Sequence, residues 1–248
     1  MNASPVRAMV LAAGQGTRLK PWTNEKPKCL VEVCGQTILD RALDAFERAG
    51  VLETVVVIGF MAGAVRARLA SRAGPMRVRC IENLEYATTN SMFSLLLGLR
   101  DCAEACWILE GDVILDDKIL RIPDSGSFCW YADAYRPDMD GAFLVRNENS
   151  RAKDVLILSP QATLPVAASS LRKSIGLLRL NQAAAGELRC WLESGVLQGK
   201  RKVYYDLIVK EQLAQWPVTV VDVLGLPWCE VDTPGDLTYG ERLFGIPR

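Results

Sequence analysis

The sequence predicts a doubly wound α/β fold with a mixed, mainly parallel sheet. Three observations support this prediction. Short apolar runs of strand length alternate with segments of helical period through the first half of the chain. The first of these runs ends at once in a turn with two glycines, Gly14 and Gly16. The chain has 248 residues, of which 50% are hydrophobic, so it can bury one large core.

The first half is expected to alternate strands and helices. The strands are predicted at 7–13, 54–58, 77–82 and 105–109, and the helices at 38–49, 62–71 and 90–100. Gly50 ends the first helix, and Asn90 is placed to cap the last one. Because parallel strands bring their carboxyl ends to one edge of a sheet, a ligand crevice is expected there.

The second half is less regular. Strands are predicted at 127–134, 142–145, 154–158, 174–180, 218–223 and 228–231, with helices at 183–192 and 205–215. The last two strands are expected to complete the sheet. No repeat or linker interrupts the chain, so residues 1–248 are interpreted as one domain.

Composition limits the expected partners and the expected location of the protein. Lys and Arg together number 29, as do Asp and Glu, so nucleic acid and anionic membranes are not expected partners. No apolar run approaches the ~20 residues that span a bilayer, and residues 1–7 are too short and polar for a signal peptide. The expected location is therefore cytoplasmic.

Histidine is absent, which excludes hydrolase triads and imidazole metal sites. The 8 cysteines form no Cys-x-x-Cys pair and are interpreted as reduced core residues. The chemistry must then depend on carboxylates, Lys, Arg, hydroxyls, backbone and metal. Attack by an ionised phosphate on the α-phosphorus of a nucleotide needs no protein base and suits this inventory.

The turn after the first strand is typical of a polyphosphate site. Gly14 and Gly16 have no Cβ, so backbone N–H groups there can approach phosphate oxygens. Thr17 adds a hydroxyl, and Arg18 and Lys28 add positive charge. The dinucleotide fingerprint would need glycine at the position of Leu19, and no Walker A ending is present.

The segment Leu-Ala-Ala-Gly-x-Gly-Thr-Arg-Leu-x-Pro, with Pro-Lys-x-Leu downstream, resembles the opening of the nucleotidylyltransferases that make sugar nucleotides and CDP-alcohols. The resemblance implies a Rossmann-like nucleotidyltransferase core, with a nucleotide-binding half at 1–123 and an acceptor-binding half at 124–248. It also implies catalytic roles for Arg18, Lys28 and Asp112. The expected nucleotide-binding residues are Leu11, Ala12, Ala13, Gly14, Gly16, Thr17, Arg18, Lys28, Glu82, Asn90 and Ser91.

Two acids are candidate metal ligands. Asp112 follows the strand 105–109 at the expected ligand edge, although it could instead cap the segment 116–120. The family resemblance implies that Asp112 binds Mg²⁺, and that Asp232, in Val-Asp-Thr-Pro-x-Asp-Leu, binds the same ion. Asp236 is interpreted as a first-turn helix acid with a structural role.

The segments around Glu82-Asn83 and Asn90-Ser91 resemble the branch that contains choline-phosphate and 2-aminoethylphosphonate cytidylyltransferases, which implies CTP. A plain helix cap is the alternative for Asn90. In the same branch an aromatic pair and an acid line the acceptor pocket, and Tyr204-Tyr205-Asp206 matches them.

Trp130 and Asp133 are further acceptor candidates, with a core role as the alternative for Trp130 and Tyr131. The choline enzymes have an aromatic residue where this chain has Gly141-Ala142, which argues against choline as the acceptor.

The expected function is Mg²⁺-dependent transfer of CMP from CTP to a small phosphorylated amino-alcohol or aminoalkylphosphonate. The alternative is a sugar-1-phosphate nucleotidylyltransferase using UTP, GTP or dTTP. A regulatory subunit without activity is disfavoured because Lys28, Asp112 and Asp232 are all present, and a dinucleotide oxidoreductase is disfavoured by Leu19. A homodimer is left open, as is the acceptor's identity.

Overall fold

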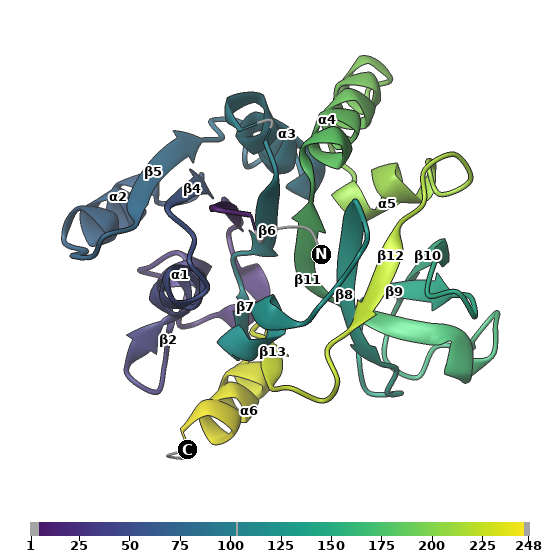
Figure 1. Ribbon diagram of the computed structural model, residues 1–248. Coiled ribbons are helices and arrows are strands. Elements are labelled where there is room, and N and C mark those ends of the chain that lie inside the picture. The colour runs from purple at the N-terminus through teal and green to yellow at the C-terminus, as the bar shows by residue number, and fades with distance from the viewer. Residues whose placement is uncertain (1–4, 103, 246–248) are drawn as a thin grey trace.

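A computed structural model describes residues 5–102 and 104–245. Figure 1 shows a central sheet with helices on both faces, in which the two halves of the chain lie side by side. The strands are β1 Arg7–Ala12, β2 Glu32–Val33, β3 Gln36–Thr37, β4 Glu53–Ile58, β5 Arg77–Glu82, β6 Cys106–Glu110, β7 Val113–Leu115, β8 Phe128–Ala134, β9 Gly141–Arg146, β10 Ala152–Leu158, β11 Leu171–Leu180, β12 Thr219–Asp222 and β13 Trp228–Glu230. The α-helices are α1 Ile38–Arg48, α2 Ala62–Ala70, α3 Ser91–Asp101, α4 Gln182–Leu197, α5 Tyr205–Lys210 and α6 Pro234–Phe244.

The first half forms the parallel part of the main sheet. β1 lies between β4 and β6 and is parallel to both, and β5 continues the parallel pairing beyond β4. Neighbouring residues of β1 point to opposite faces, so Val10 and Met9 belong to different core clusters. The carboxyl ends of β1 and β6 therefore meet at one edge, as the sequence predicts.

The second half adds antiparallel strands around β11. One edge of β11 pairs with β6 near its end and with β9 near its start, while the other edge pairs with β8. The register with β8 shifts between Ser174 and Leu177, where Gly176 has φ +69. The main sheet is thus mixed, with β12 added in parallel to β8.

Two expectations for the second half are wrong. β13 pairs antiparallel with β7 in a separate two-stranded sheet, so it does not complete the main sheet. The helix expected at 205–215 is α5, which ends at Lys210 because the following residues turn instead of continuing the α-helical hydrogen bonds. The pairing with β7 nevertheless fixes the position of Glu230, the last residue of β13.

The helices cover the two faces of the sheet. α3 packs against α4 and α5 over one face, while α1 lies on the other beside β7 (Figure 1). Buried cysteines contribute to these cores, although Cys34 and Cys190 are exposed, and every cysteine is a free thiol. Among the residues that the structure describes, no helix has the length and apolar character to cross a membrane.

Candidate active site

The glycine turn leaves β1 at the carboxyl edge of the sheet. Gly16 has φ +62, and a Cβ there would lie 2.7 Å from the Cβ of Lys28, so glycine allows the lysine to pack against the turn. A Cβ at Gly14 would meet nothing within 4 Å, and Gly14 opens onto a cavity. Thr17 is exposed, whereas the side chain of Ala12 is buried in the core.

Lys28 joins the two acids that the sequence places at the metal site. Its Nζ donates to Asp112 Oδ2 at 2.6 Å and also to Asp232 Oδ1. Burial lowers the pKa of Lys28, but the two carboxylates outweigh burial and raise the pKa above its usual value. The ammonium group of a nearly buried lysine therefore lies between Asp112 and Asp232.

Arg18 extends this network towards solvent. It donates to Asp232 Oδ2 at 2.5 Å and to Asp140 Oδ2 at 3.2 Å. Burial raises the pKa of Asp232, but Lys28 and Arg18 outweigh burial and hold this pKa below its usual value. Both predicted cations thus lie against carboxylates here, within reach of the glycine turn.

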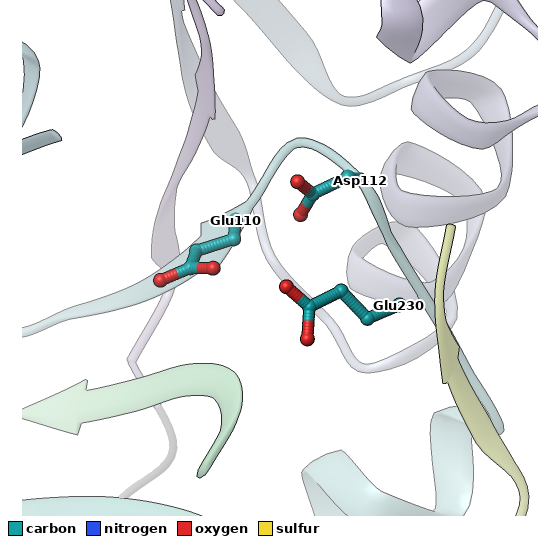
Figure 2. A group of neighbouring side chains, drawn as sticks. All are labelled: Glu110, Asp112 and Glu230. Atoms are coloured by element: carbon teal, nitrogen blue, oxygen red, sulfur yellow. The ribbon is translucent and has the colours of Figure 1, made fainter. Parts of the chain in front are cut away.

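Asp112 belongs to a second group of acids, which it forms with Glu110 and Glu230 (Figure 2). Each of the three offers a carboxylate oxygen, and these oxygens lie within 4.8 Å of one another. Asp112 Oδ1 is buried and has no hydrogen-bond partner in the described structure. Clustered carboxylate oxygens and one buried oxygen without a partner fit a hard divalent cation such as Mg²⁺.

The sequence did not single out Glu110 and Glu230. The available signal was position: Glu110 ends β6, and Glu230 ends β13, two residues before Asp232. Burial is the main cause that raises the pKa of Glu110, and negative charge on Asp206, Asp112 and Glu230 adds to it. Burial likewise raises the pKa of Glu230 to about 7, although Lys173 opposes the shift.

A cavity of about 240 Å³ lies beside the glycine turn, between Leu11, Ala13 and Gly14 on one side and the start of α3 on the other. Asn90 Oδ1 accepts a hydrogen bond from the Ser91 backbone N–H at 2.7 Å, so the helix-cap role is confirmed. Both side chains also line the cavity.

The sequence predicts that Glu82 binds the nucleotide, but the structure directs its side chain away from this cavity. Its carboxylate pairs with Arg66 at 2.5 Å and does not line the cavity, whereas the next residue, Asn83, does. Asn83 Nδ2 donates to Thr89 Oγ1 at 3.1 Å and to Ser94 Oγ at 3.0 Å. Consecutive residues of an extended segment point to opposite faces, so a displacement of one residue removes Glu82 from the site.

A second cavity, of about 500 Å³, continues from the first, and Glu110, Tyr204 and Glu230 are among the residues that line both. Asp206 and Ala142 also line this larger cavity. Burial raises the pKa of Asp206 to about 6. The larger cavity thus contains a buried acid beside the half-exposed ring of Tyr204.

Three of the acceptor candidates lie elsewhere. Tyr205 is fully buried and lines neither cavity, and its hydroxyl donates to Glu110 Oε1 at 2.7 Å. Trp130 is also fully buried and donates from Nε1 to Ser174 Oγ at 2.8 Å, as its core alternative predicted. Asp133 lines neither cavity, and its Oδ2 accepts a hydrogen bond from Trp228 Nε1 at 2.9 Å.

Comparisons with known proteins agree with this architecture. Residues 8–123 match the model of the MobA-like NTP transferase domain. A CMP-5'-(3-aminopropyl)phosphonate synthase of Streptomyces rubellomurinus is 31% identical over 100% of this chain, which spans 40% of that relative's length. The choline-phosphate cytidylyltransferase of Streptococcus pneumoniae is 24% identical, with 96% of this chain and 98% of the relative aligned.

A solved structure shows the same fold. The CTP:phosphocholine cytidylyltransferase of Streptococcus pneumoniae superposes with a TM-score of 0.79 over 95% of this chain and 97% of that chain, at 21% identity. The mixed sheet with its Rossmann-like nucleotidyltransferase core, predicted from the sequence, is confirmed.

Proposed function

Since the chain belongs to the nucleotidylyltransferase family, we propose that it is a Mg²⁺-dependent cytidylyltransferase. It transfers CMP from CTP to a small phosphorylated amino-alcohol or aminoalkylphosphonate and releases pyrophosphate. The nucleotide binds mainly through residues 1–123 and the acceptor mainly through residues 124–248, with Glu230 and Asp232 of the second half reaching the boundary between the two cavities.

The observation that carries the acceptor class is Asp206, a buried acid that lines the larger cavity and not the smaller one and has no ion pair among the described residues. The other acids that line this cavity are Glu110, Asp140, Glu230 and Asp232, and its cations are Arg18 and Lys173. An acceptor that brings only negative charge would gain little there. A positively charged amine on the acceptor offsets the buried acids and stabilises their ionised forms.

The reaction needs no protein base. An oxygen of the acceptor's phosphate or phosphonate is already ionised near neutral pH and attacks the α-phosphorus of CTP. The new bond joins that oxygen to the α-phosphorus, and the bond to the bridging oxygen breaks as pyrophosphate leaves. Arg18 and Lys28 are close enough to the glycine turn to exchange their carboxylate partners for phosphate oxygens.

Asp112 and Asp232 would hold Mg²⁺, with Glu110 and Glu230 close enough to Asp112 to contribute, and the bound ion would offset charge on the triphosphate. The carboxylates also keep Lys28 charged before substrate arrives.

The cavity favours a primary amine over a trimethylammonium group. Ala142 offers no aromatic face, so the acceptor's cation meets Tyr204 and Asp206 on one side only. A primary ammonium can donate hydrogen bonds to Asp206, which a trimethylammonium group cannot. We therefore expect 2-aminoethylphosphonate or phosphoethanolamine to be used better than phosphocholine.

The test is a pyrophosphate-release screen of CTP, UTP, GTP and dTTP against phosphorylated amino-alcohols, aminoalkylphosphonates and hexose 1-phosphates. The proposal expects release with CTP and an amine-bearing acceptor, at roughly tenfold higher kcat/KM for a primary amine than for phosphocholine. Reaction only with hexose 1-phosphates, or with nucleotides other than CTP, would contradict it.

A further inference from the structure

Lys173 is a buried cation in the wall of the larger cavity, which we call the acceptor cavity. It lies on β11, is 5% exposed, and donates from Nζ to Glu230 Oε2 at 3.0 Å. The same Nζ lies 5.9 Å from the ring centroid of Phe143 and 6.0 Å from that of Trp228. A single ammonium group is therefore held between one carboxylate and two aromatic faces.

These three surroundings are what a ligand's ammonium group would need. Aromatic faces attract cations through their quadrupoles, and a carboxylate supplies the opposite charge. We call Phe143, Trp228 and Glu230 the Lys173 niche. The chain fills this niche with its own side chain before any ligand arrives.

The backbone makes room for the lysine. Gly141 has φ +93, and a Cβ there would lie 3.2 Å from Lys173 Nζ. The ammonium group of Lys173 thus occupies the niche, with Nζ against Glu230 Oε2.

We propose that Lys173 determines acceptor specificity: its ammonium group fills the Lys173 niche, excludes the acceptor's cationic group from it, and leaves Asp206 as the acid for the acceptor's amine. The role in acceptor choice rests on the proposed function. The occupation of a cation-binding niche does not, and it can be tested by binding alone.

Removal of the lysine should open a larger space. Lys173 lines both the acceptor cavity and a neighbouring cavity of about 280 Å³ that contains Trp228 and Tyr239. Without the side chain, the two cavities would meet at a vacant acid-and-aromatic niche. A tetramethylammonium ion carries the charge and bulk that this niche could then accept.

The binding experiment compares thermal unfolding in tetramethylammonium chloride with that in sodium chloride of equal concentration, about 0.1 M. Lys173→Ala should gain about 2–4 °C in the midpoint with tetramethylammonium, whereas the wild type and the exposed-lysine control Lys153→Ala should gain nothing beyond sodium. If the alanine variant does not fold, Lys173→Ser, whose hydroxyl gives Glu230 a donor, takes its place.

The activity experiment follows the ratio of kcat/KM for phosphocholine to that for 2-aminoethylphosphonate. Lys173→Ala should raise this ratio at least about fivefold, and Lys173→Arg, which keeps a cation, should leave it near the wild-type value. No extra tetramethylammonium stabilisation in a folded Lys173 variant would overturn the proposal, as would failure of both variants to fold even with tetramethylammonium.

The two experiments separate the two proposals. A gain in tetramethylammonium binding without cytidylyltransferase activity in the wild type would support the niche and contradict the proposed function. An unchanged acceptor ratio, in a variant that binds tetramethylammonium and remains active, would overturn the specificity role.

Discussion

The two cavities differ in how their acids are balanced. Beside the glycine turn, Asp112 and Asp232 both contact Lys28, and Asp232 also contacts Arg18. Asp206, which lines only the acceptor cavity, has no ion pair among the described residues. Glu110 and Glu230 line both cavities; Glu110 has no ion pair there either, and Glu230 has only Lys173. The aspartates beside the glycine turn are therefore paired with cations, whereas the aspartate peculiar to the acceptor cavity is not.

The pKa values follow this difference. The pKa of Asp232 is lowered by its cations, whereas burial raises the pKa of Asp206 to about 6 and that of Glu230 to about 7. Buried acids without a cation cost stability, so a protein keeps them mainly where a ligand compensates for them. The comparison supports a proposed phosphate site whose aspartates are balanced by cations and a proposed acceptor site whose Asp206 is not.

The largest expected effect concerns Asp112 and Asp232, the two aspartates that are paired with cations beside the glycine turn. Asp112→Asn or Asp232→Asn removes charge opposite the reacting phosphates, so turnover with CTP should fall by at least ~10²-fold without loss of the fold. Turnover at saturating Mg²⁺ and circular dichroism measure the two properties. The exposed Glu148→Gln is the control, and chelation of divalent cations should abolish wild-type turnover. Near-normal turnover in either aspartate variant would contradict the metal assignment.

The second prediction separates the two cations beside the glycine turn. Lys28 is buried against Asp112, whereas the side chain of Arg18 is 58% exposed, so their roles should differ. Lys28→Ala should lower kcat by a larger factor than it changes KM, because the departing pyrophosphate is stabilised less well. Arg18→Ala should mainly raise KM for CTP. Steady-state kinetics of both variants decide this, and the reverse pattern would mean that the two roles are exchanged.

The third prediction concerns Asp206, the aspartate peculiar to the acceptor cavity. Asp206→Asn keeps the shape of the side chain but removes the charge that would meet the acceptor's amine. The kcat/KM for the amine acceptor should fall roughly tenfold while the KM for CTP changes little. An equal loss for both substrates would show that Asp206 does not distinguish the two cavities.

The fourth prediction concerns stability and leaves activity aside. The pKa of Asp206 is raised from its ordinary 3.8 to about 6, so its protonated form is favoured by folding and its stabilising contribution is lost as pH rises through 6. Asp206→Asn should therefore unfold with a free energy up to about 3 kcal/mol higher than the wild type at pH 8 and converge with it near pH 4. Urea unfolding at both values measures this. A pH-independent difference would argue against a buried charge at this position.

Local sequence patterns predicted much of the nucleotide side. The alternation of apolar runs and helical segments located β1, β4, β5 and β6, and the strand ends placed Gly14 and Asp112 at one edge. The cap at Asn90 was also predicted correctly. These features depend on backbone conformation and on neighbours a few residues away, which a sequence displays directly.

The sequence by itself predicted the glycine turn at the carboxyl edge of the sheet and the resemblance to nucleotidylyltransferases, and it singled out Lys28, Asp112 and Asp232, which lie together in the structure. Only the tertiary structure decided that Asn83 and not Glu82 lines the smaller cavity, that Trp130 belongs to the core, and that β13 pairs with β7. It also brought Glu110, Glu230 and Lys173 together, from three strands far apart in the chain. Which face a side chain takes, and which distant acid or ring it meets, depends on strand register and packing, and no local pattern records these.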